Sequence, residues 1–209
     1  ENDDSCEYAQ VNYDCDGNCT VEVDCFGECG GSAELDECNV CGGSGPETGY
    51  TCAGTPEFFV YNQSTQQAFY YFSSVTIENV LLESDDWVGA FNGDICVGAR
   101  QWDTSQCNGG ICDVPVMGFD GNEYSEGYML TGDIPSFKMF DVSQGEYFDA
   151  VPSEDVPWFP MGFSNIDYLE GGIFGCMDAM ACNYNPDASV DDGSCTLPQG
   201  CNNWCAGDY

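Results

Sequence analysis

The stretch Phe58–Ile77, FFVYNQSTQQAFYYFSSVTI, decides the fold of the central part of this chain. Two runs of aromatic and β-branched residues favour extended strands, and the polar segment Asn62–Gln67 between them favours a turn. The pattern predicts two strands with enough apolar surface to begin a hydrophobic core.

Further strands are predicted downstream of this stretch. Trp87–Phe91, the turn Asn92-Gly93 and Ile95–Gly98 predict a β-hairpin, because Asn-Gly favours the positive backbone angles of a type I′ turn. No stretch predicts an amphipathic helix of three or more turns. Short strands at this spacing are typical of an all-β fold with a central antiparallel β-sandwich. The later predicted strands are Val114–Met117, Tyr128–Leu130, Phe137–Phe140 and Tyr147–Val151.

The charge of the chain is strongly negative. Two basic residues, Arg100 and Lys138, face 37 acidic ones, for a formal net charge of −35. Nucleic acid is excluded as a partner class, because the basic residues that neutralise phosphates are missing, and anionic membranes are disfavoured for the same reason. The hydrophobic fraction of 43% is enough to bury a core, so the chain is predicted to fold.

The cysteines divide the chain and indicate its compartment. Sixteen cysteines predict disulfides and a secreted or cell-surface location, and the absence of histidine leaves zinc bound only by cysteines as the rival interpretation. No transmembrane run is present, and the start at Glu1 predicts a mature form whose signal peptide has been removed. The predicted regions are 1–54 (cysteine-rich), 55–174 (β-sandwich) and 175–209 (cysteine-rich). In chain order, the cysteines are Cys6, Cys15, Cys19, Cys25, Cys29, Cys38, Cys41, Cys52, Cys96, Cys107, Cys112, Cys176, Cys182, Cys195, Cys201 and Cys205.

The number of cysteines in each region bears on their pairing. The regions hold eight, three and five. If all are bridged, each of the two odd groups sends at least one cysteine outside its region. A bridge from the centre to the tail or a bridge to a neighbouring molecule both satisfy this count, and the sequence leaves the connectivity open.

A short unit repeats in the cysteine-rich regions. Asp14–Cys19 reads DCDGNC, Asp24–Cys29 reads DCFGEC, and Glu37–Gly43 reads ECNVCGG. Such glycine-rich units bury little apolar surface, so disulfides and ions are expected to fix them. The end of Gly175–Cys195, VDDGSC, is echoed by NDDSC at Asn2–Cys6, as if the chain began in the tail of the unit that closes it.

These stretches carry two resemblances. DCDGNC, DCFGEC and LDECNVCGGSG resemble the thrombospondin type 3-like repeats of extracellular microbial proteins, and GCMDAMACNYNPDASVDDGSC is similar to a repeat of the form GCTDxxACNYNPxAxxDDGSC. DDWVGAFNGDICVGARQW and FKMFDVSQGEYFDA resemble a β-sandwich module of secreted bacterial surface proteins, with its GAFxGxxCxG hairpin. The resemblance implies an extracellular, calcium-rich, non-catalytic context. The alternating aspartates of thrombospondin type 3 repeats proper are reduced here to Asp14-Cys-Asp16-Gly-Asn18.

Calcium is the predicted cofactor, because closely spaced carboxylate and amide oxygens are the ligands it prefers. The alternative is that the same side chains cap turns in a solvated acidic loop. The predicted calcium ligands are Asp178, Asn183, Asn185, Asp187, Asp191 and Asp192, with a second, weaker set at Asp14, Asp16, Asn18, Asp24 and Asp36.

Other residues suggest further interpretations. Asn62-Gln-Ser64 and Asn18-Cys-Thr20 match the N-glycosylation pattern. Asp85 and Asp86 are expected to cap a turn before Trp87 or to bind an ion. Among 37 acids some pair always lies at a catalytic spacing, so no pair indicates catalysis and the chain is predicted not to be an enzyme. Aromatic side chains that could stack on sugars or pack in a core are Tyr70, Tyr71, Trp102, Tyr124 and Trp158.

Together these observations predict a secreted structural protein. It is expected to be a calcium-stabilised subunit that joins copies of itself head to tail through its cysteine-rich ends, forming a filament or surface assembly. A carbohydrate-binding or adhesion module of a larger surface protein is the alternative, with glycans as partners.

Overall fold

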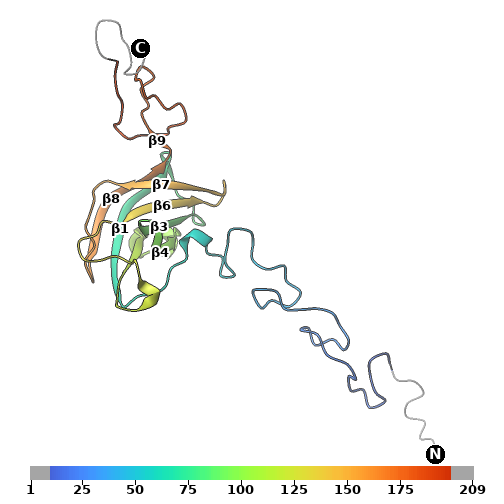
Figure 1. Ribbon diagram of the computed structural model, residues 1–209. Coiled ribbons are helices and arrows are strands. Elements are labelled where there is room, and N and C mark those ends of the chain that lie inside the picture. Colours follow the sequence, from blue (N-terminus) through green and yellow to red (C-terminus); the bar gives the residue numbers. More distant parts are fainter. Residues whose placement is uncertain (1–9, 199–209) are drawn as a thin grey trace, which may run out of the picture. The chain divides into compact units, whose positions relative to one another are not determined.

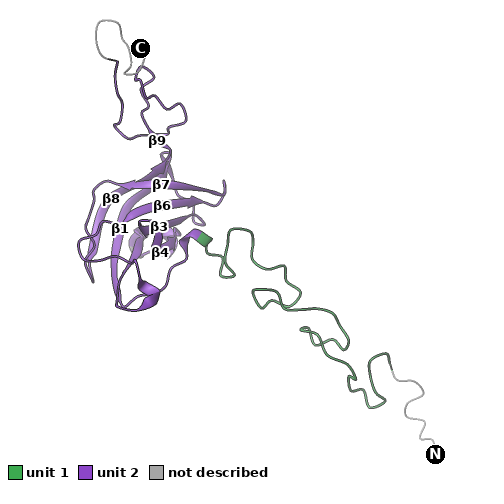
Figure 2. Ribbon diagram, in the orientation of Figure 1, with its two compact units in different colours: residues 1–57 green, residues 58–209 purple. Residues whose placement is uncertain are grey.

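The computed structural model describes residues 10–198, so the segments Asn2–Cys6 and Cys201–Cys205 lie outside the described residues. The chain divides into two compact units, Glu1–Glu57 and Phe58–Tyr209 (Figure 2). The described helices are single 3-10 turns: η1 (Glu57–Phe59), η2 (Thr104–Gln106), η3 (Asn108–Gly110) and η4 (Glu123–Ser125). The all-β prediction is therefore confirmed.

One curled sheet forms the body of the second unit (Figure 1). Its eight strands follow the order β2-β1-β8-β7-β6-β3-β4, with β5 also paired to β1. The division into two packed sheets that a sandwich requires is not confirmed, since these strands belong to one hydrogen-bonded sheet. The strands are β1 (Gln66–Ile77), β2 (Val80–Leu81), β3 (Trp87–Asn92), β4 (Ile95–Gln101), β5 (Asp113–Gly118), β6 (Ser136–Asp141), β7 (Glu146–Pro152) and β8 (Phe163–Gly172); β9 (Phe174–Gly175) and β10 (Val190–Asp191) form a separate pair.

Strand β1 is the longest strand and pairs with three others. It pairs in parallel with β8 along one edge and antiparallel with β5 and β2 along the other. Ala68, Tyr70 and Phe72 alternate into the core, as the period of two for a strand requires. The second run of the opening stretch is therefore a strand, as predicted.

The first run of that stretch is not a strand, and here the prediction is wrong. Phe58 and Phe59 both belong to η1, and their rings contact the ring of Tyr147 at centroid distances of 5.2 and 5.5 Å. Phe59 is fully buried against Gly89, where a Cβ atom would lie 2.8 Å from its ring. The apolar residues of this run thus pack on the sheet and do not extend it.

Strand β8 was not predicted from the sequence. Its large buried residues Ile166 and Leu169 are three positions apart, as are their partners Phe72 and Val75 in β1, and the register between the two strands does not shift. This irregularity breaks the alternation of period two by which strands are recognised. The predicted strand at Tyr128–Leu130 is also wrong, since this segment makes only an isolated bridge between Met129 and Gly118.

The predicted hairpin is present as β3 and β4. The predicted turn is wrong in position and type: Asn92 pairs with Ile95, so the two-residue loop is Gly93-Asp94. Gly93 has a φ of 60° but Asp94 has no positive φ, whereas a type I′ turn needs positive angles at both loop residues. The register shifts between Ala90 and Phe91, which marks a β-bulge.

The curl of the sheet brings β4 beside β5. A side chain at Gly98 of β4 would overlap the carbonyl oxygen of Pro115 of β5, so only glycine fits this approach. Phe69 pairs with Pro115 and donates its N–H to Gly162 on the β8 side. Because the N–H of Phe69 points away from β5, the backbone nitrogen of its partner Pro115 points away from β1 and toward β4. Proline has no N–H to donate there, and β4 and β5 pack against each other without a hydrogen-bonded ladder.

Candidate functional site

The first unit is a series of small loops, each closed by an isolated β-bridge. The bridges join Tyr13 to Cys19, Val23 to Cys29, and Leu35 to Cys41. A fourth bridge joins Tyr50 to Pro56 in a loop that the sequence analysis did not recognise, because Thr51 replaces the aspartate of the other loops. The sequence Cys52-Ala-Gly54 after Thr51 has the same Cys-x-Gly spacing as the first two repeats and could have identified this loop.

The aspartate of each repeat closes its own loop. Asp36 Oδ1 accepts hydrogen bonds from the N–H groups of Cys38 and Val40, both at 2.8 Å, and Oδ2 accepts one from Gly45, also at 2.8 Å. The bond from Val40, then that from Gly45, lowers the pKa of Asp36. Asp24 Oδ1 likewise accepts hydrogen bonds from the N–H groups of Phe26 and Glu28, the equivalent positions of its own repeat.

The other loops use the same arrangement. Asp14 Oδ1 accepts from the N–H groups of Asp16 and Asn18, and Thr51 Oγ1 takes the corresponding role in the fourth loop. Of the weaker predicted calcium ligands, Asp14, Asp24 and Asp36 are thus used as turn caps, and Asn18 donates its side-chain amide to Asp14. Asp16 is exposed and contributes its backbone N–H to the same turn.

Disulfides link each repeat to the next. Cys19–Cys29, Cys25–Cys41 and Cys38–Cys52 overlap along the sequence, so each closed segment contains a cysteine of the following bridge. The tail contains Cys176–Cys195, and Cys15 and Cys182 are disulfide-bonded as well. The disulfide prediction is confirmed for these residues, while Cys6, Cys201 and Cys205 lie outside the described part.

One cysteine of the sheet body departs from the prediction. Cys107 and Cys112 are bridged across η3, but Cys96 on β4 is a free thiol and is buried. The prediction that Cys96 forms a disulfide is wrong, because its side chain is enclosed by the sheet body. This burial raises the pKa of the Cys96 thiol to about 11.

The tail loop between Cys176 and Cys195 contains the main set of predicted calcium ligands. Each of its carboxylates that accepts a bond does so from a nearby backbone N–H: Asp178 from Met180, Asp191 from Gly193, and Asp192 from Ser194. The bonds from Ser194 lower the pKa of Asp192, the side-chain bond most. Asn185 Oδ1 accepts from the N–H of Asp187, and Asn183 binds both Ser194 and Thr196.

These contacts place the predicted ligands in successive turns of one loop. Among residues 10–198, no three cysteine, aspartate or glutamate side chains converge in a group that would hold a metal ion. Asp178, Asp191 and Asp192 each commit one carboxylate oxygen to a turn. The second oxygens of Asp178 and Asp191 make no hydrogen bond within the described residues, whereas the Asp192 carboxylate also accepts the side-chain bond from Ser194.

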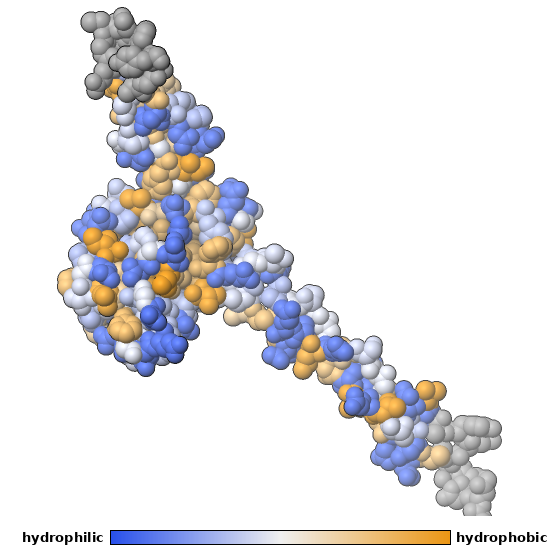
Figure 3. Space-filling view, in the orientation of Figure 1, coloured by the Kyte–Doolittle hydropathy of each residue, from blue (hydrophilic) through white to orange (hydrophobic). Residues whose placement is uncertain are grey.

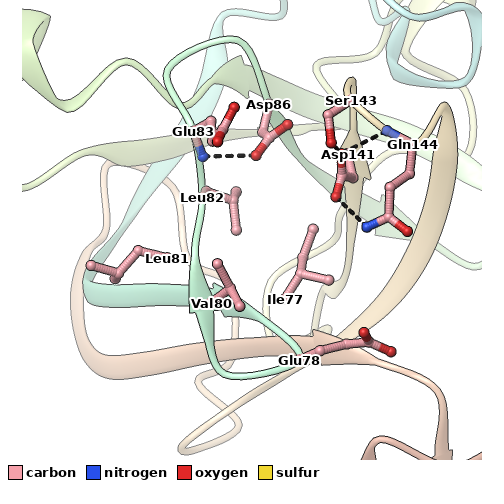
Figure 4. Close-up of a pocket in the computed structure, with 10 residues that line it drawn as sticks. All are labelled: Ile77, Glu78, Val80, Leu81, Leu82, Glu83, Asp86, Asp141, Ser143 and Gln144. Atoms are coloured by element: carbon pink, nitrogen blue, oxygen red, sulfur yellow. Dashed lines mark hydrogen bonds between the residues drawn. The ribbon is translucent and has the colours of Figure 1, made fainter.

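A pocket of about 260 Å³ lies beside β2 in the sheet body. Ile77 and Val80 line one side, and the carboxylates of Asp86 and Asp141 lie opposite (Figure 4). Asp141 accepts bonds from the N–H and the side-chain amide of Gln144, at 3.0 and 2.6 Å. The other lining residues are Glu78, Leu81, Leu82, Glu83 and Ser143.

Asp86 is a buried structural carboxylate at the edge of this pocket. It is 5% exposed, and its two oxygens accept bonds from the N–H groups of Glu83 (2.7 Å) and Val142 (3.0 Å). Burial raises its pKa, and the two backbone bonds only partly offset this. Of the two predicted roles, capping a turn is the one that the contacts support, while Asp85 is exposed.

The candidate sugar-stacking aromatics are mostly core residues. Trp102 is 4% and Trp158 is 2% exposed, and Trp158 donates its ring N–H to the carbonyl of Val116. Tyr70 is buried and donates its hydroxyl to the carbonyl of Val156. Stacking on a bound sugar by these three rings is therefore ruled out, because a core ring offers no free face.

The remaining candidates lie nearer the surface. Tyr71 is half-buried, and Tyr124 is exposed and donates its hydroxyl to Asp120 at 2.8 Å. Asn62 is exposed, as a glycosylation site requires, while Ser64 of the same motif is buried and donates to the carbonyl of Gly118.

Comparisons with protein-family models, with curated proteins and with solved structures find no match to this chain. Across residues 10–198, no helix has the length and apolarity needed to cross a membrane. The numerous disulfides are consistent with an extracellular location.

Proposed function

We propose that this chain is a secreted, non-enzymatic structural protein, a calcium-stabilised subunit that joins copies of itself head to tail through its cysteine-rich ends. The observation that supports this most directly is the overlapping disulfide series of the first unit. Cys19–Cys29, Cys25–Cys41 and Cys38–Cys52 tie four core-less loops into one continuous element. Such an element resists extension because unfolding one loop is limited by the bridge of the next.

The cysteine count supports joining between chains. With Cys96 unpaired, fifteen of the sixteen cysteines remain in the 209-residue chain, and an odd number cannot all pair within one chain. A covalent bridge to a neighbouring copy would use the cysteine that is left over. Electrophoresis without reducing agent is expected to show a series of disulfide-linked multimers that collapses to one band on reduction.

Calcium is proposed as the counter-charge at each joint. A net charge of −35 makes the approach of two copies unfavourable, and the second oxygens of Asp178 and Asp191 in the tail loop are the groups offered to the ion. Electron microscopy of purified material in calcium and in a strong chelator tests the proposal. Filaments that persist unchanged in chelator contradict the calcium joint, and monodisperse monomers in calcium contradict the polymer.

Carbohydrate binding is the second candidate function. The observation in its favour is a set of exposed apolar and aromatic side chains on the sheet body, among them Phe58, Phe163 and Tyr168. Figure 3 shows hydrophobic patches on the visible face of this body. Glycan arrays probed with the wild type and with Tyr168→Ala would test it. Trp102 and Trp158 are unsuitable targets, since truncating a core tryptophan is expected to destabilise the body by about 3–5 kcal/mol.

A further inference from the structure

The bridge between Cys107 and Cys112 differs from the other described disulfides in its neighbours. Nη1 of the Arg100 guanidinium lies 3.7 Å from Cys107 Sγ. Arg100 is one of two basic residues in the chain, and the other, Lys138, pairs with an aspartate of β7. The two segments that contain the other described bridges have no lysine or arginine. Because a nearby cation stabilises a thiolate, the Cys107–Cys112 bridge is the described one best suited to thiolate chemistry.

An ion pair holds this guanidinium in place. Arg100 lies on β4 and Asp113 begins β5, and Nη2 of Arg100 is 3.1 Å from Asp113 Oδ1. The guanidinium is a planar fork, so one of its nitrogens can face the carboxylate while the other faces the sulfur. The positive charge beside Cys107 is therefore fixed by two strands of the sheet body.

The two sulfurs of the bridge have different surroundings. Cys107 is half-buried, whereas Cys112 is fully buried. Gly109 and Gly110 between them are exposed, and a Cβ atom at either would meet open space, so the loop leaves Cys107 accessible. The Asp103 carbonyl oxygen lies 3.8 Å from Cys112 Sγ. A bridged sulfur has no hydrogen to donate, but a Cys112 thiol would have this carbonyl as its acceptor.

The other ionisable groups near the bridge are occupied elsewhere. The Asp103 carboxylate accepts bonds from two side chains of η2, and these bonds, that from Ser105 most, lower its pKa. Tyr61 interacts electrostatically with Arg100 and Asp113, and burial raises its pKa, so its hydroxyl stays neutral. The guanidinium is therefore the charged group that contacts a sulfur of the bridge.

We propose that the Cys107–Cys112 bridge is the site at which this chain takes up a thiol, as a mixed disulfide on Cys107. The ligand class is a thiol, carried either by a small molecule or by a cysteine of a second protein. The exchange is stoichiometric, and it depends neither on calcium nor on the proposed self-assembly.

The exchange balances without an outside oxidant. The incoming thiol loses its proton to water, and its sulfur attacks Cys107 Sγ to form a new S–S bond. The bond to Cys112 breaks, and its electron pair stays on Cys112 Sγ, which takes up a proton and becomes a thiol. During the attack the negative charge is shared by three sulfurs. Beside Arg100 this charge is stabilised, whereas the acidic surfaces of a chain with net charge −35 repel it.

The test treats the folded full chain with 2-mercaptoethanol, a neutral probe that adds no charge of its own in its thiol form. The reaction is quenched with acid, free thiols are alkylated, and peptides are mapped by mass spectrometry. The mercaptoethanol adduct is expected on Cys107 and the alkyl group on Cys112. This adduct should form roughly tenfold faster than any at the bridges of the first unit.

Charge variants separate the guanidinium from mere accessibility. Arg100→Gln is expected to slow adduct formation roughly tenfold, whereas Arg100→Lys keeps the charge and should slow it less. Lys138→Gln removes the same unit of charge outside the site and is the matched control, which should react like the wild type. Tryptophan fluorescence checks that each variant is folded.

A further variant does not depend on how Arg100 variants fold. Cys112→Ser leaves Cys107 as a free thiol beside Arg100, and its alkylation rate should rise with pH at a lower pH than that of free cysteine in the same solution. In the untreated native material, a low-mass adduct on Cys107 identifies a small-molecule ligand, and a cross-linked peptide identifies a cysteine of a protein.

Three results overturn the proposal. The first is adduct formation at the first-unit bridges as fast as at Cys107. The second is a folded Arg100→Gln variant that reacts like Lys138→Gln. The third is a Cys112→Ser variant whose Cys107 is alkylated no more readily at low pH than free cysteine. Since none of these measurements involves calcium or filaments, failure here leaves the proposed structural function standing, and the reverse also holds.

Discussion

Replacing Asp86 by alanine is expected to destabilise the sheet body strongly. Its carboxylate joins the segment before β3 to the turn after β6, through bonds from the N–H groups of Glu83 and Val142. Alanine leaves both donors buried without an acceptor, at about 1–3 kcal/mol each. Because burial already disfavours the charge of Asp86, part of this loss is offset, and the expected decrease in the free energy of unfolding is about 2–4 kcal/mol.

Asp86→Asn separates the hydrogen bonds from the charge. Asparagine keeps one acceptor oxygen and removes the buried charge, so a smaller loss of about 1–2 kcal/mol is expected at neutral pH. The native pKa of Asp86 is raised above its ordinary value of 3.8, so the stability that its protonation adds is fully present below 3.8 and is lost as pH rises through the native pKa. The free energy of unfolding of the wild type should therefore rise relative to that of the asparagine variant as pH falls from the native pKa of Asp86 toward 3.8.

Urea unfolding with the disulfides intact measures these effects. Tryptophan fluorescence reports on the sheet body, since Trp102 and Trp158 are core residues. Asp85→Ala is the matched control, because Asp85 is exposed and adjacent, and it should change stability by less than about 0.5 kcal/mol. An Asp86→Ala variant as stable as this control, or a difference between wild type and asparagine variant that does not change with pH, would refute the reasoning.

Three further predictions follow from the sheet body. Gly98→Ala should lower the free energy of unfolding by about 1–3 kcal/mol, because its methyl group would overlap the Pro115 carbonyl; an unchanged denaturation midpoint would show that β4 and β5 are not held this closely. Cys96 should resist an aromatic disulfide reagent at pH 7 and be modified only in denaturant, because burial raises its thiol pKa to about 11, and rapid labelling of the native chain would contradict this. Met161→Gly should raise the free energy of unfolding of the monomer by about 1 kcal/mol by relieving a left-handed backbone, with calorimetry as the readout and a lower melting temperature as the contrary result.

The sequence by itself determined the features that depend on neighbouring residues. Strand β1, the hairpin around Gly93, β6 with β7, and the cysteine-rich repeats were predicted from local patterns, while the pairing of the cysteines was left open. The glycine of a tight turn, the alternation of a strand and the spacing of cysteines act over a few residues, so they can be read directly.

The tertiary structure decided what depends on residues far apart. It made Phe58 and Phe59 packing residues rather than a strand, placed β8 beside β1 in spite of a broken alternation, and left Cys96 unpaired. It turned the aspartates of the cysteine-rich loops toward their own backbone N–H groups, whereas the sequence left turn caps and calcium ligands as alternatives. A carboxylate accepts a hydrogen bond from whichever donor the fold brings near it. Which donor that is depends on the whole chain rather than on the spacing of the acidic residues in the sequence.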